Sequence, residues 1–169
     1  MKKRGTIIII SVLVLLAAAI AVLAVFNDPG EAETGTLTVV CEGEAVRTFT
    51  MDEVMEMPYI EVYKKISSSS FQDIEGTFRG VPLRAIIDSA DASLLTDATQ
   101  IITRSEDAFA AAFSAEEVTE SDSVFVAYSL DGKSLGTMDS GGTGPFRLII
   151  ADDEFGNRSA KYLFKVEIR

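Results

Sequence analysis

The chain has 169 residues, contains no histidine and no tryptophan, and has a single cysteine, Cys41. Without histidine, Ser-His-Asp and Cys-His catalysis and the usual zinc sites are excluded, and one cysteine excludes an intrachain disulfide. All 26 acidic residues lie beyond residue 26, together with 12 of the 15 basic residues, which gives that part of the chain a net charge of about −14. Such a charge repels phosphate backbones, so we expect no nucleic-acid partner.

An uncharged apolar run of 21 residues, TIIIISVLVLLAAAIAVLAVF, occupies positions 6–26. At about 1.5 Å per residue it is long enough to cross a hydrocarbon core of roughly 30 Å. Because it follows the basic sequence MKKR, we predict that residues 1–26 are a membrane anchor with its basic end in the cytoplasm. A cleaved signal peptide is the alternative. Residues 27–35 are typical of a linker, which leaves residues 36–169 as one domain outside the cytoplasm, at the cell surface or in a periplasm.

The domain is rich in predicted strands, which are short and largely consecutive along the chain. The clearest pair is a hairpin at residues 123–136, because Asp131-Gly132 is a strong signal for a two-residue turn. Helices are few and short, so the pattern indicates an α+β fold with mixed or antiparallel sheets. Further strands are predicted at residues 36–43, 45–50, 59–66, 98–105, 144–152 and 160–169.

The predicted helices are placed by the signals at their ends. Thr50 and Glu53 form a capping box at the start of a short helix. Pro82 suits the first position of a second helix, residues 82–90, which presents one apolar face. The segment AFAAAFSAEEV is ambiguous, and one interpretation is a strand that runs into a short helix capped by Ser114.

Three segments, taken in order along the chain, resemble a known family. The C-terminal segment, LDGKSLGTMDSGGTGPFRLIIADDEFGNRSAKYLFKVEI, combines the hairpin, a Gly-rich turn, Gly-Pro-x-Arg-Leu, and Ser-x-Lys before the last strand. Together with FTMDEVMEMP and FRGVPLRAII, it resembles the molybdopterin-binding domain of the sulfite oxidase-like oxidoreductases over most of residues 36–169. The resemblance implies that family's fold and molybdopterin as a cofactor. It also implies an oxidoreductase that acts on a small oxyanion or sulfoxide, with a membrane or heme electron-transfer partner.

The same resemblance implies a set of cofactor-binding residues. Arg147 matches the arginine of the family's Pro-x-Arg-Leu strand, which helps to hold the pterin pyrophosphate, and a guanidinium suits phosphate oxygens because it presents a planar fork of donors. Ser159, Ala160 and Lys161 match the Ser-x-Lys loop, which holds the cofactor through backbone amides and the lysine. Thr103 matches, more loosely, a position that touches the pterin. The alternatives are that Arg147 pairs with an acid and that Lys161 is a solvated strand residue.

The chain departs from the family at the molybdenum ligand. The family strand that corresponds to IEVYKKIS delivers a cysteine whose thiolate binds the metal, and the register places that position at Ser67 or Ser68. A serine hydroxyl is a poorer ligand than a thiolate unless the metal deprotonates it, and Cys41 lies on another strand. Ser67 or Ser68 is therefore the candidate metal ligand, and Ser68 is also a candidate cofactor contact. The alternative is a polar loop whose hydroxyls bind local backbone groups.

These residues leave two classes of function open. One is a molybdopterin-dependent oxidoreductase, and the other is a non-catalytic ligand-binding or interaction module on the same fold.

Overall fold

The computed structural model describes residues 11–20, 35–67, 73–153 and 156–169. By its internal contacts the chain divides into two units, residues 1–31 and residues 32–169. In the first unit, residues 11–20 are helical, and the rest of the predicted anchor lies outside the described residues. Within the described residues, no helix is long and apolar enough to cross a membrane.

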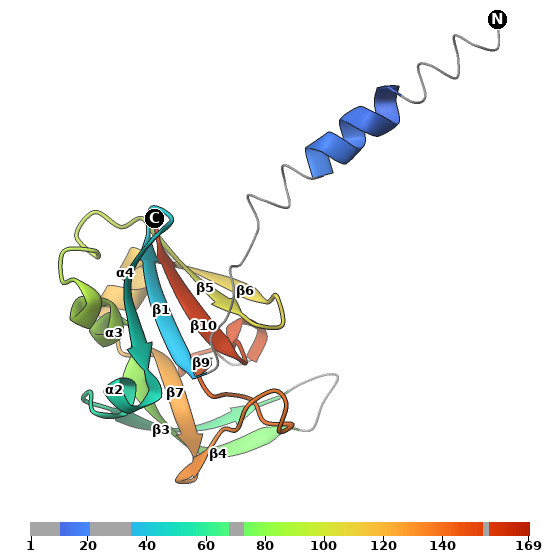
Figure 1. Cartoon of the computed structure of the whole chain (residues 1–169). Coiled ribbons are helices and arrows are strands. Elements are labelled where there is room, and N and C mark those ends of the chain that lie inside the picture. The colour runs from blue at the N-terminus through green and yellow to red at the C-terminus, as the bar shows by residue number, and fades with distance from the viewer. Residues whose placement is uncertain (1–10, 21–34, 68–72, 154–155) are drawn as a thin grey trace, which may run out of the picture. The chain divides into compact units, whose positions relative to one another are not determined.

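The first sheet of the domain contains the strands β1 (Thr36–Cys41), β2 (Glu44–Thr50), β5 (Gln100–Ser105), β6 (Ala110–Ser114) and β10 (Leu163–Ile168). Their order across the sheet is β2-β1-β10-β5-β6 (Figure 1). The central strand, β10, is parallel to β1 and antiparallel to β5. The parallel pair therefore joins the beginning of the domain to its end.

The second sheet contains β3 (Ile60–Ile66), β4 (Ile74–Pro82), β7 (Val124–Leu130), β8 (Lys133–Ser134) and β9 (Arg147–Ile150). Its order is β3-β4-β7-β8, and β9 pairs antiparallel with β7 beside β8. The predicted hairpin is confirmed as β7 and β8, but β8 is only two residues long and the main partners of β7 are β4 and β9. The strand β4 was not predicted.

Three short α-helices and one 3-10 turn connect the strands: α2 (Met51–Met55), α3 (Leu83–Ala90), α4 (Ala115–Glu120) and η1 (Gly156–Arg158). The capping box of α2 is confirmed, because the backbone N–H of Thr50 donates to Glu53 at 2.8 Å and the Thr50 hydroxyl accepts from the Glu53 N–H at 3.3 Å. Ser114 caps α4 as one interpretation predicted. Pro82 ends β4 instead of opening α3, which begins one residue later.

The buried apolar side chains form two clusters, one on each face of the second sheet. The first and larger cluster lies between the two sheets, where Leu148 of β9 and Val166 of β10 belong to it. The second cluster consists of Ile66, Phe78, Phe125, Ala127, Leu135 and Ile149. Because successive residues of a strand point to opposite faces, β7 contributes to both clusters, which explains its continuous apolar sequence. The predicted α+β class is confirmed.

Candidate anion site

The alternation of β9 directs Arg147 toward the second cluster. Leu148 belongs to the first cluster and Ile149 to the second, so Arg147 shares a face with Ile149. Its cross-strand partner on β7 is Ala127, which is also a member of the second cluster. A guanidinium is therefore placed against an apolar surface that also includes Ile66, the last residue of β3.

Arg147 carries a buried charge that has no partner among the described residues. Its side chain is only 3% exposed, and its Nε and Nη1 atoms find no hydrogen-bond partner in the described part of the chain. Burial lowers the pKa of Arg147 to about 10, and the nearby Tyr162 opposes this effect. Buried donors are almost always satisfied in folded proteins, so these two nitrogens are candidates to bind an external acceptor. The predicted alternative, an ion pair with an acid, is not seen among the described residues.

The Ser-x-Lys loop lies directly beside β9. The N–H of Leu148 donates to the carbonyl of Ala160 at 2.8 Å, so the loop and the arginine are neighbours. Ala160 is buried, and Lys161 is half-buried. The hydroxyl of Ser159 is also buried and has no partner among the described residues. The structure thus brings Arg147 together with the Ser159–Lys161 segment, and it adds a second unpartnered donor.

Gly156 brings the end of β3 to the same place. A Cβ added at Gly156 would lie 2.4 Å from Cγ2 of Ile66 and 4.0 Å from the carbonyl oxygen of Ser67, so only glycine permits this approach. The carbonyl of Gly156 in turn accepts from the N–H of Ser159 at 3.1 Å. The hydroxyl of Ser67 is exposed and 3.4 Å from a carboxylate oxygen of Asp73. Ser68 lies outside the described residues.

Thr103 lies on a different face from Arg147. It is fully buried and pairs with Ala111 of β6. It lies on the same face of β5 as Ile101, which belongs to the first cluster between the sheets. Its hydroxyl donates to the carbonyl of Ala111 at 3.3 Å, so its donor is already used. The structure therefore does not direct the Thr103 hydroxyl toward the face that carries Arg147.

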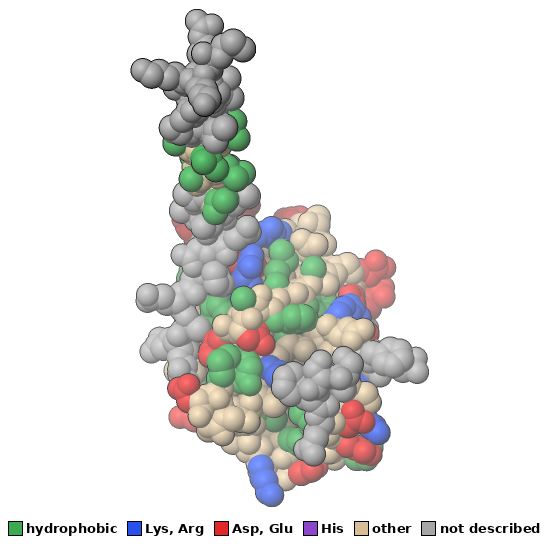
Figure 2. Space-filling view, turned by 90° about the vertical axis from the view of Figure 1, so that its right-hand side faces the viewer, with side chains coloured by type: hydrophobic (Ala, Val, Ile, Leu, Met, Phe, Trp, Pro, Cys, Tyr) green, Lys and Arg blue, Asp and Glu red, His purple; other side chains and the backbone are tan. Residues whose placement is uncertain are grey.

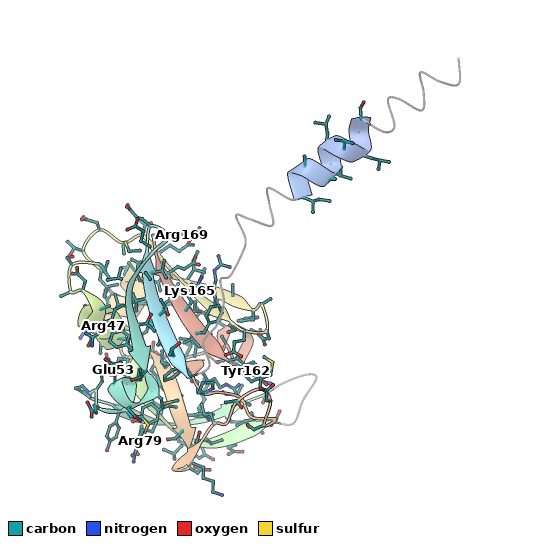
Figure 3. All side chains as sticks on the ribbon, in the orientation of Figure 1. Arg47, Glu53, Arg79, Tyr162, Lys165 and Arg169 are labelled. Carbon is teal, nitrogen blue, oxygen red and sulfur yellow. The ribbon has the colours of Figure 1, made fainter. Side chains whose placement is uncertain are left out.

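Tyr162 holds the surrounding loops in place, although the sequence analysis did not single it out. Its φ of 55° is a left-handed conformation that is unfavourable for a bulky side chain. Its hydroxyl donates to Gly142 at 2.9 Å, its N–H to Thr143 at 3.4 Å, and its carbonyl accepts from Glu106 at 3.0 Å. Tyr162 thus joins the Gly-rich turn, the β5–β6 turn and the Ser-x-Lys loop, at the end of β10 opposite to Arg169 (Figure 3). No sequence pattern marks this role.

Acidic side chains gather at the β5–β6 turn. Partial burial raises the pKa of Glu106, and the carboxylates of Asp139 and Asp107 raise it further. Asp107 also accepts from the N–H of Phe109 at 3.1 Å, which is ordinary turn chemistry. Since the N–H of Glu106 bonds to Tyr162, this acidic turn borders the same group of loops.

The residues fit the anionic part of a molybdopterin better than they fit its metal. A guanidinium and a serine hydroxyl suit phosphate oxygens, whereas serines stand where the family has its metal-binding cysteine. Cys41 pairs with Ile168 at one end of β10, while the Ser-x-Lys loop meets Leu163 at the other. These ends are separated by about 16 Å at roughly 3.3 Å per residue. Cys41 therefore cannot supply the family's thiolate.

Fold and site together define an α+β domain with a candidate anion site, in which a buried arginine lies beside a loop. The chain belongs to the oxidoreductase molybdopterin binding domain family, which matches residues 27–169. Molybdopterin is therefore the cofactor for which this type of domain is built.

Sixteen chains of solved structures are similar to this chain. One belongs to the crystal structure of the sulfane dehydrogenase SoxCD from Paracoccus pantotrophus, with a TM-score of 0.63 and 16% identity over 82% of this chain. This chain spans 39% of the length of that chain, and at this identity the likeness shows a shared fold. No curated protein sequence matches.

Proposed function

We propose that the domain holds the phosphate end of molybdopterin at Arg147, with the hydroxyl of Ser159 and the loop through Lys161 as further contacts. The observation that carries this proposal is the pair of buried guanidinium nitrogens that find no acceptor in the described part of the chain. A phosphate oxygen would satisfy them and would offset the cost of burying the charge. The placement of Ala160 beside β9 supports a common contact surface.

The proposal includes membrane anchorage through residues 1–26, with the domain outside the cytoplasm. It is supported by the uncharged apolar run of 21 residues and by the basic residues that precede it. The many acidic residues beyond this run suit a soluble domain on a linker.

When molybdenum is also bound, the cofactor supplies oxygen-atom or electron transfer, and the protein would act as an oxidoreductase on a small oxyanion or sulfoxide. The buried Arg147 would orient the cofactor, and the Ser-x-Lys loop would fix its phosphate end. A membrane or heme partner would be needed to exchange electrons. Ser67 or Ser68 would stand at the position of the metal-binding cysteine.

A second candidate function is a non-catalytic ligand-binding or interaction module. It is favoured by the position of Cys41 at the far end of β10 and by the serines in place of the thiolate. In this case the site would hold the pterin without the metal, or another anionic ligand.

The two functions are distinguished by the cofactor content of the full chain. The chain would be purified from a host that makes molybdopterin, and its pterin and molybdenum would be measured per mole of protein. Equal amounts of both would support the oxidoreductase, whereas pterin without metal would support the module. In the second case, Ser67→Cys and Ser68→Cys are compared with the parent, and molybdenum in one of them would identify the ligand position. If the parent contains neither pterin nor metal, the molybdopterin proposal is wrong.

A further inference from the structure

Lys64 lies on the face of β3 that points toward the second cluster. On this face of the strand it lies between Val62, which packs against the cluster, and Ile66, which belongs to it. The next residue, Lys65, points to the opposite face and forms an ion pair of 3.2 Å with Asp73. Two adjacent lysines of the same strand therefore have different surroundings.

Within the described residues, the ammonium group of Lys64 is held by main-chain oxygens alone. It donates to the carbonyl of Ala151 at 2.8 Å and to the carbonyl of Asp153. The carboxylate of Asp153 is engaged elsewhere, since it accepts two hydrogen bonds from Arg158, at 2.7 and 3.0 Å. A lysine ammonium has three donors, so one N–H of Lys64 has no acceptor among the residues that the structure describes.

Neither Lys64 nor Arg147 forms an ion pair with a carboxylate of the described residues, although the chain has 26 acids against 15 bases. On the face shown in Figure 2, acidic and basic side chains are interspersed, so carboxylates are not scarce on the surface. Ion pairs with carboxylates of the described residues are seen for Arg47, Lys65, Arg79, Arg104, Arg158 and Arg169.

Lys64 and Arg147, which form no ion pair within the described ranges, border the same cluster. Arg147 shares its face of β9 with Ile149, a member of the second cluster, and Ala151, whose carbonyl holds Lys64, packs against that cluster as well. We propose that Lys64 is a further cationic contact of the anion site around Arg147. It favours a ligand group with two or more negative charges, either a phosphate monoester or a diphosphate. This inference rests on the proposed function, because it concerns the same site.

The test uses the full chain from a host that lacks molybdopterin, with inorganic pyrophosphate as the probe and calorimetry at low salt as the measurement. We expect Lys64→Gln to weaken pyrophosphate binding about tenfold, as removal of one charge from a site of intermediate dielectric constant predicts. Lys64→Arg keeps the charge and should retain most of the affinity. Lys65→Gln is the matched control on the outer face, and it should bind within about twofold of the parent because exposed charges are screened.

The inference would be overturned by a parent chain that does not bind pyrophosphate, by an unchanged affinity in Lys64→Gln, or by an equal loss in Lys65→Gln. Far-UV circular dichroism of each variant verifies its fold, and Lys64→Arg provides the second variant if Lys64→Gln unfolds. A loss of affinity in Lys64→Arg as large as in Lys64→Gln would also contradict it. The outcome is separable from the proposed function. A chain that gains no pterin in a cofactor-making host, yet loses pyrophosphate affinity in Lys64→Gln, would refute molybdopterin binding alone.

Discussion

Replacing Arg147 with methionine is expected to stabilise the ligand-free domain while removing its ability to hold an anion. Methionine preserves much of the apolar stem on the strand face shared with Ile149, but it removes a charge that has no partner among the described residues. Replacement of a buried charge by an apolar side chain of similar size is often neutral or stabilising. The opposite signs of the two effects distinguish a binding residue from a structural one.

The pKa of Arg147 gives the magnitude. Burial lowers it to about 10, and since one pKa unit corresponds to about 1.4 kcal/mol, the charge costs the folded state about 3 kcal/mol. Because the folded pKa lies below the unfolded pKa, this cost is fully present below pH 10 and disappears as the pH rises toward the ordinary value of arginine. At pH 7, Arg147→Met should therefore gain up to about 3 kcal/mol, or about 10 °C in Tm for a domain of this size.

The assay is urea unfolding of the full chain, followed by far-UV circular dichroism at pH 7 in protein from a host without molybdopterin. The control is Arg79→Met, because Arg79 is exposed and pairs with Glu61 at 2.7 Å. Loss of such a surface pair should cost no more than about 1 kcal/mol. If Arg147→Met lowers the free energy of unfolding by 1 kcal/mol or more, the guanidinium has a stabilising partner in the ligand-free protein, and the reasoning fails.

Three further predictions concern stability. Glu106→Gln should stabilise the domain at pH 7, since the raised pKa of Glu106 makes its ionised form unfavourable in the folded state. The gain in the free energy of unfolding should vanish below the unfolded pKa of about 4.3. A gain that is unchanged at pH 3 would contradict this. Gly80→Ala places a Cβ 2.3 Å from the carbonyl oxygen of Val126, so a loss of about 3 kcal/mol or more is expected in urea unfolding, and a loss below 1 kcal/mol would show that β4 and β7 can separate freely. Thr50→Ala removes half of the capping box with Glu53 and should cost about 1 kcal/mol, whereas Thr50→Ser should cost little; equal effects would exclude the hydroxyl as the cause.

Local signals made much of the fold predictable. The capping box at Thr50 and the turn at Asp131-Gly132 depend on residues close together in the sequence, and both appear in the structure. The strand β4 was missed because Gly76 and Gly80 interrupt its pattern, and glycine normally weakens a strand. At Gly80 the reason lies in its neighbour β7, whose backbone leaves no room for a side chain.

The site was only partly predictable. Arg147 and the segment from Ser159 to Lys161 were found through a resemblance, and the structure brings them together through a backbone hydrogen bond between Leu148 and Ala160. Lys64 was missed because Lys64 and Lys65 are adjacent, and the sequence alone does not show which of the two lysines points toward the second cluster. Tyr162 was missed because its role depends on three loops that meet only in the folded chain.

The most direct test of molybdopterin binding at Arg147 is the pterin content of the full chain and of Arg147→Met, each purified from the same molybdopterin-producing host. If Arg147 binds molybdopterin, we expect close to one pterin per chain in the parent. We expect almost none in Arg147→Met, although this variant is folded and at least as stable as the parent. Equal pterin content in the two proteins would contradict it.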